Sequence, residues 1–216
     1  MLRERAGHDK ASLTMQDRRS HAFTLIELLV VITIIVVLMG LLFPAFRGVQ
    51  DQAKRTQAKN DLTQIVTAVN AYFTEYGKYP LPAGATNDTI YGAGVPNVAV
   101  LSELRGLSGS LLNPKQIAFI SPPDVKDPAH PRGGIGGTAD RPGEYFDPWG
   151  TPYLIEIDGD FEGRVANPYT GHAGSTPDLQ TGVIAWSLGK DQNGATTAAA
   201  GDKQTGTYDD DVISWQ

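Results

Sequence analysis

The chain has 216 residues, 24 acidic and 18 basic side chains, a net charge of −6 and no cysteine. This length allows one or two modest domains, and the lack of cysteine excludes disulfides and thiolate metal sites. Only eight Lys or Arg but 17 Asp or Glu follow Pro80, which argues against nucleic acid as a partner, because phosphate binding requires clustered cations.

The first predicted element is the apolar run Phe23–Phe43, FTLIELLVVITIIVVLMGLLF. At about 1.5 Å per residue, a helix of this length can cross a bilayer. Its one ionisable residue, Glu27, is a candidate functional residue, because a lone carboxylate in hydrocarbon is costly. The alternative is a Glu27 near enough to the headgroups to be solvated. Arg18 and Arg19 precede the run, which predicts a cytoplasmic N-terminus.

The segment HAFTLIELLVV, residues 21–31, resembles the processing and assembly segment of type IV pilins and type II secretion pseudopilins. The resemblance implies that residues 1–22 are a prepilin leader, cleaved between Ala22 and Phe23, and that Phe23 is then N-methylated. The family usually has Gly before the cut, so Ala22 predicts slower processing.

The same resemblance implies that Glu27 pairs with the free amine of Phe23 in a neighbouring subunit. Opposite charges attract strongly in a low dielectric, and either one alone is costly there. An uncleaved signal anchor is the alternative interpretation, and the start, at Met1 or Met15, stays open.

A second apolar stripe continues at helical spacing beyond Pro44. Gly77 and Pro80 predict its end. We therefore expect residues 23–76 to form one long helix, kinked at Pro44, with residues 23–46 in the membrane and residues 47–80 as the amphipathic half and exit. The stripe comprises Leu62, Ile65, Val66, Val69, Tyr72 or Phe73, and Tyr76.

Residues 81–143 are a variable insert rich in Pro, Gly, Asn and Ser. One helix is predicted at residues 98–107, and a second short helix is predicted to start at Asn113, with proline in its first turn. The Gly/Pro-rich stretch 121–143 is expected to be a surface loop.

Residues 144–216 are predicted to form a β-sheet head with an acidic loop. Strands are expected at residues 152–158 and 183–187, and the Asp158-Gly159 turn predicts a hairpin with a returning strand at 161–165. The expected fold class is α+β: a long N-terminal transmembrane and amphipathic helix packed on a small antiparallel sheet, as in type IV pilins.

The segments 186–194 and 208–215 are similar to the C-terminal end of type II secretion major pseudopilins, and residues 147–153 (DPWGTPY) match a strand entry of the same family. The resemblance implies one bound Ca²⁺, an ion that takes six to eight oxygen ligands. The alternative is a solvated acidic tail. The expected ligands are Asp191, Asp209, Asp211 and the Leu188 carbonyl, with Ser187 as a further candidate.

A competing calcium interpretation is the segment DGDFEG, residues 158–163. Its acidic residues follow the spacing of the first half of an EF-hand loop, but Tyr169 stands at the twelfth position, where a bidentate Glu is required. A charged hairpin turn is the preferred interpretation.

No catalytic set can be assembled from the sequence. The S-x-x-K match of Ser187 and Lys190 lacks its companion motifs, and His130 and His172 stand alone in predicted loops. An enzyme is therefore not expected.

The resemblance implies a structural subunit of a type II secretion-like pseudopilus, a helical homo-oligomer. Its implied partners are minor pseudopilins, a prepilin peptidase and methyltransferase, an inner-membrane assembly platform and the membrane itself. The expected location is the bacterial inner membrane, crossed once, with a periplasmic head. A type IV pilus subunit and a membrane-anchored ligand-binding head are the alternatives.

Overall fold

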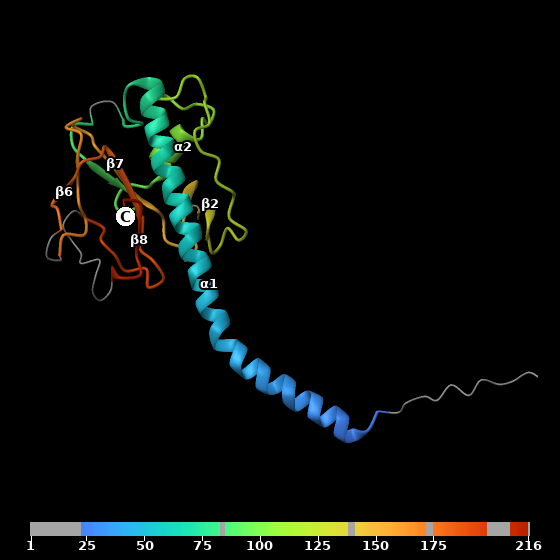
Figure 1. Ribbon diagram of the computed structural model, residues 1–216. Helices are drawn as coiled ribbons and strands as arrows, with labels where there is room; N and C mark the ends of the chain where they lie inside the picture. The colour runs from blue at the N-terminus through green and yellow to red at the C-terminus, as the bar shows by residue number, and fades with distance from the viewer. Residues whose placement is uncertain (1–22, 83–84, 138–140, 172–174, 198–207, 216) are drawn as a thin grey trace, which may run out of the picture. The chain divides into compact units, whose positions relative to one another are not determined.

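The computed structural model describes residues 23–82, 85–137, 141–171, 175–197 and 208–215, with the backbone alone at residues 43–45. The chain divides into two compact units, Met1–Arg47 and Gly48–Gln216, each described by itself (Figure 1). The predicted leader, including Ala22, lies outside the described residues.

The helix α1, Leu25–Tyr76, has 52 residues and confirms the predicted long helix. Its apolar side chains from Leu25 to Leu42 are exposed. It is the one helix of the described residues that is long and apolar enough to cross a membrane. Pro44 lies within α1 and does not end it, so the kink at this residue stays a prediction.

The second half of α1 buries one face, as the apolar stripe predicts. Leu62, Ile65, Val69 and Tyr72 are fully buried in the main core of the second unit. The helix ends before Gly77, which has a φ of 67° and donates its N–H to the Phe73 carbonyl at 2.8 Å. A left-handed backbone conformation at this position favours glycine.

The core partner of α1 is a four-stranded antiparallel sheet in the order β1-β4-β7-β8. Figure 1 shows β7 and β8 alongside the second half of α1. The strands are β1 Thr89–Tyr91, β4 Leu154–Ile157, β7 Val183–Ser187 and β8 Val212–Ile213.

Both faces of the sheet are covered. Ile155 and Ile157 belong to the core that contains α1, whereas Leu154 and Trp186 belong to a second apolar cluster. All four residues of β4 are buried as a result, including Glu156.

Shorter elements complete the second unit. The helix α2 occupies Val98–Leu104, within the predicted helical segment. Two small antiparallel pairs accompany the main sheet: β2 Gly134–Gly136 with β3 Glu144–Phe146, and β5 Val165–Ala166 with β6 Asp178–Leu179.

The predicted hairpin at Asp158-Gly159 is wrong. The chain turns there, but β4 pairs with β1 and β7, and the following strand β5 pairs with β6 instead. A turn signal is local, whereas strand pairing depends on partners from distant parts of the chain.

Two predictions in the insert are also wrong. Asn113 begins a turn and no helix, because its side-chain amide donates to the Glu103 and Ile117 carbonyls, both at 2.8 Å. Asn side chains compete in this way with helical hydrogen bonds. The stretch 121–143 is not only a surface loop, since it contains β2.

A buried carboxylate ties α1 to the sheet side of the core. Asp61 is 9% exposed, and its Oδ2 accepts a hydrogen bond from the Tyr153 hydroxyl at 2.8 Å. Burial raises the pKa of Asp61, while hydrogen bonds from Tyr153 and Tyr145 oppose that increase. The hydroxyl groups of these two tyrosines therefore offset part of the cost of burying a carboxylate on this face of the helix.

We predict that Tyr153→Phe lowers the free energy of unfolding by about 1–3 kcal/mol, because Asp61 then loses a donor in a buried position. Urea unfolding of the full chain in detergent measures the change. Tyr208→Phe, which removes the hydroxyl group of a half-buried tyrosine, is the control and should change stability less. Equal effects of the two substitutions would contradict this role of the Tyr153 hydroxyl.

Glu156 is the polar residue on the opposite face of the sheet, and it is 2% exposed. Burial, followed by the charge of Asp88, raises its pKa to about 8. Between the ordinary glutamate pKa of 4.5 and the raised pKa of about 8, the unfolded chain has already lost a proton that the folded protein keeps. Glu156 therefore lowers the stability of the fold as the pH rises through this range.

We predict that Glu156→Gln stabilises the protein by roughly 1–3 kcal/mol at neutral pH and that the gain disappears near pH 4, where Glu156 is protonated in both states. Urea unfolding at several pH values, with EDTA present, measures it. Glu75→Gln, at a partly exposed helix position, is the matched control. A gain independent of pH would show that the charge of Glu156 is not its cause.

Candidate functional site

The N-terminus of α1 places Glu27 in a capping box. Its Oε2 accepts hydrogen bonds from the backbone N–H of Thr24 at 2.9 Å and from the Thr24 hydroxyl at 2.7 Å. The Thr24 hydroxyl in turn accepts from the Glu27 N–H at 3.3 Å. This reciprocal arrangement satisfies two helix-terminal donors and places the carboxylate where the helix dipole favours negative charge.

Thr24 has no role among the predictions from the sequence, although the T-x-x-E spacing is a recognisable signal for this arrangement. The capping box gives Glu27 donors within its own chain, and the Phe23 side chain beside it is exposed.

The C-terminal acidic loop brings together Asp191, Asp210 and Asp211. One carboxylate oxygen from each lies within 4.8 Å of the others, so the structure groups two of the predicted ligands with Asp210. Asp209 is not in this group, and its side chain is exposed. Three carboxylates at this separation suit a hard divalent cation.

Backbone contacts shape this acidic group. The Asp210 Oδ2 accepts from the Lys190 N–H at 2.6 Å and the Asp191 N–H at 3.1 Å, and the Asp211 Oδ2 accepts from the Tyr169 hydroxyl at 2.5 Å. A Cβ added at Gly194 would lie 2.7 Å from the Asp211 Oδ2, so the loop leaves no room for a side chain there.

The hydroxyl group of Ser187 links the end of β7 to Asp147 through a hydrogen bond. It donates to the Asp147 Oδ2 at 2.6 Å and accepts from the Gly189 N–H at 3.2 Å. The other oxygen of Asp147 accepts from the N–H groups of three residues that follow it, Trp149, Gly150 and Thr151. The DPWGTPY segment is therefore a turn organised by a buried carboxylate, attached to the end of β7.

Two lysines fasten the C-terminal region to the second half of α1. The Lys190 Nζ lies 2.6 Å from the Asp51 Oδ2, and the Lys59 Nζ donates to the Ile213 carbonyl at 2.7 Å. The acidic loop is thus linked to the helix on both sides of the Asp191–Asp211 group.

Comparison with known proteins gives a consistent result. A model of the prokaryotic N-terminal methylation motif matches residues 17–43. The chain is 41% identical to the type II secretion system core protein G of Pseudomonas aeruginosa over 66 residues, which are 31% of this chain and 46% of that protein.

The core protein G of Aeromonas hydrophila is 28% identical over 168 residues, 76% of this chain and 94% of that protein. The chain is thus similar to type II secretion system core proteins G, and it carries the N-terminal methylation motif.

The chain spans about half the length of the Pseudomonas relative. The type IV major pilin protein PilA of Myxococcus xanthus is 38% identical over 61 residues, 28% of each chain. No solved structure gives a significant match.

Proposed function

We propose that this chain is a non-enzymatic structural subunit of a type II secretion-like pseudopilus, a filament that drives protein export. The observation that carries the proposal is the methylation motif at residues 17–43, which overlaps the first part of the 52-residue helix α1 and contains its capping-box acid Glu27. The Aeromonas relative, matched over 94% of its length and named as a type II secretion core protein, supports it.

In the proposed mechanism, a prepilin peptidase cleaves between Ala22 and Phe23, and Phe23 is methylated. Before assembly the subunit lies in the inner membrane, where the capping box supplies Glu27 with hydrogen-bond donors that lipid cannot offer. On assembly, the positive amine of Phe23 from a neighbouring subunit approaches Glu27. A charged donor forms a stronger hydrogen bond than the neutral Thr24 groups, and this gain favours one register between stacked helices.

The proposed surroundings follow from this mechanism. The N-terminus lies in the cytoplasm and the head in the periplasm, and the subunit meets minor pseudopilins and an inner-membrane assembly platform. The second candidate is a type IV pilus subunit, which the match to the Myxococcus major pilin favours.

Complementation of a gene deletion tests the function. We predict that deletion leaves exported proteins in the periplasm, that wild type restores export, and that Glu27→Ala restores at most a small fraction of it. Glu75→Ala, which removes an acid from the other end of α1, is the matched control and should restore export. Mass spectrometry of each membrane-assembled protein should show the loss of residues 1–22 and one added methyl group.

An intact leader on the assembled protein would overturn the proposal, and so would full export by the Glu27→Ala strain. Loss of surface fibres and twitching with normal export would establish the type IV pilus alternative instead.

We also propose that Asp191 and Asp211, together with Asp210, bind one Ca²⁺, with the Leu188 carbonyl and Asp209 as further oxygen ligands. The convergence of three carboxylates within 4.8 Å supports this site. The ion would join the segment after β7 to the segment before β8 and close a loop of about 20 residues, a link that a chain without cysteine cannot make with a disulfide.

We predict that Ca²⁺ at ~100-fold above its dissociation constant stabilises the fold by roughly 2.7 kcal/mol through this site. Thermal melts of the full chain in detergent, with Ca²⁺ or EDTA, measure the gain. Asp191→Asn and Asp210→Asn should each reduce it and remove one bound Ca²⁺ per chain, whereas Asp127→Asn, an exposed acid elsewhere, should not. Unchanged Ca²⁺ stoichiometry in both loop variants would refute the site.

A further inference from the structure

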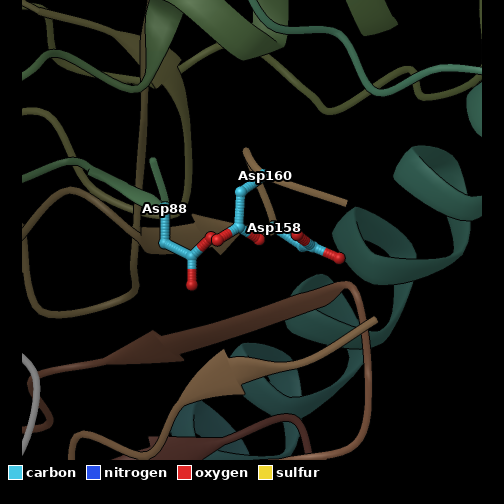
Figure 2. Close-up of side chains that lie close together, drawn as sticks. All are labelled: Asp88, Asp158 and Asp160. Atoms are coloured by element: carbon cyan, nitrogen blue, oxygen red, sulfur yellow. The ribbon is translucent and has the colours of Figure 1, made fainter. Parts of the chain in front are cut away.

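A second group of carboxylates forms at the other end of the sheet. Asp88 immediately precedes β1, while Asp158 and Asp160 follow β4, and one oxygen from each lies within 4.8 Å of the others. The register Thr89↔Ile157 places Asp88 opposite Asp158. Figure 2 shows the carboxylates of Asp88 and Asp160 facing each other, with Asp158 beside them.

Backbone N–H groups hold these carboxylates in position. The two oxygens of Asp158 accept from Glu162 at 3.2 Å and Gly163 at 2.8 Å, and the Asp88 Oδ1 accepts from Gly159 at 2.9 Å. Such bonds orient the oxygens but bring no full positive charge.

The neighbouring basic residue, Arg164, forms its salt bridges with other carboxylates. Arg164 lies 2.7 Å from the Glu162 carboxylate and 3.4 Å from that of Asp178. Among the described residues, no Lys or Arg forms a salt bridge with Asp88, Asp158 or Asp160. The repulsion between these three like charges is therefore not relieved by a salt bridge within the described residues, although the charge of Arg164 attracts Asp160 from a longer distance.

Glu156 provides an independent observation at the same place. In an antiparallel sheet, alternate residues of a strand and their direct cross-strand partners share a face. Glu156 is paired with Ile90, so its side chain lies on the face that carries Asp88 and Asp158. It is 2% exposed, and its Oε2 has no hydrogen-bond partner among the described residues.

A buried carboxyl oxygen without a partner is costly, and this one lies next to the Asp88 carboxylate, whose charge acts on it. We infer that Asp88, Asp158 and Asp160 bind a second divalent cation, with Ca²⁺ as the fitting ion, and that the buried carboxyl group of Glu156 lies behind it.

The chemistry of the three ligands selects calcium. Ca²⁺ accepts carboxylates, carbonyls and water in flexible numbers, whereas Mg²⁺ demands near-ideal octahedral geometry. Asp160 is exposed, so water can complete the coordination from that side. The loop 158–163 has acids at the first, third and fifth positions and Gly163 at the sixth, with a φ of 81°, which matches the start of an EF-hand loop. Asp88 replaces the carboxylate that an EF-hand supplies from further along its own loop.

This inference revises the preferred interpretation of the DGDFEG segment as a charged hairpin turn. It is independent of the proposed pseudopilus function and of the C-terminal calcium site. An affinity of about 10⁻⁴–10⁻³ M is expected, as in extracellular calcium modules.

Calcium binding to the full chain in detergent, measured by equilibrium dialysis, tests the site. The doubly substituted chain Asp191→Asn/Asp210→Asn, which removes the C-terminal group, should still bind one Ca²⁺. Adding Asp160→Asn or Asp88→Asn should weaken this binding at least tenfold. Adding Asp127→Asn, an exposed acid remote from the loop, should leave it unchanged.

Asp160 is exposed, and Asn at position 88 keeps an oxygen acceptor for the Gly159 N–H, so both variants should melt in EDTA as their parent does. The inference is overturned if the doubly substituted chain binds no Ca²⁺ up to several times 10⁻³ M. It is equally overturned if Asp160→Asn and Asp88→Asn bind the ion as tightly as the Asp127→Asn control.

Discussion

The fold of the second unit depends on the burial of one face of α1 against the sheet. Leu62, Ile65 and Tyr72 are fully buried with Ile155 and Ile157 in one core. Each such side chain contributes about 1.5–3 kcal/mol when it leaves water. Exposed ion pairs such as Lys115 with Glu75 are worth only about 0–1 kcal/mol each, so packing, rather than surface charge, fixes how the helix and sheet meet.

Polar groups inside this packing are tolerated where hydrogen bonds compensate for them. Asn97 is fully buried and donates to the carbonyls of Tyr145 and Tyr153 at 3.0 and 2.9 Å. Asp147 and Asp61 are satisfied by turn N–H groups and by tyrosine hydroxyls, respectively. Glu156 differs from all three, because no hydrogen bond within the described residues satisfies its buried Oε2. The cost of burying this oxygen is therefore not offset by a hydrogen bond.

The sequence predicted the elements whose signals are local. The helix α1 has a long apolar stripe and a glycine stop, and β7 coincides with the predicted strand at residues 183–187. The strand β1 was missed because it has only three residues, which pair with a segment more than 60 residues away. Only the fold brings Asp88 to Asp158, and only the loop conformation decides that Asp210 rather than Asp209 joins Asp191. Three consecutive acids look alike in a sequence, whereas the folded loop brings only two of them, Asp210 and Asp211, to Asp191.

The strand directions place the two acidic groups at opposite ends of one sheet. Asp158 follows the C-terminal end of β4, and Asp191 follows the C-terminal end of β7, which runs antiparallel to β4. The outer strands β1 and β8 have only three and two residues, so few ladder hydrogen bonds hold them to the centre of the sheet. A cation at Asp88 and Asp158 would fasten β1 to the end of β4, and one at Asp191 and Asp211 would fasten β8 to the end of β7. In a chain without cysteine, paired cation sites would thus stabilise both short edge strands, each through carboxylates that lie immediately outside the strands they join.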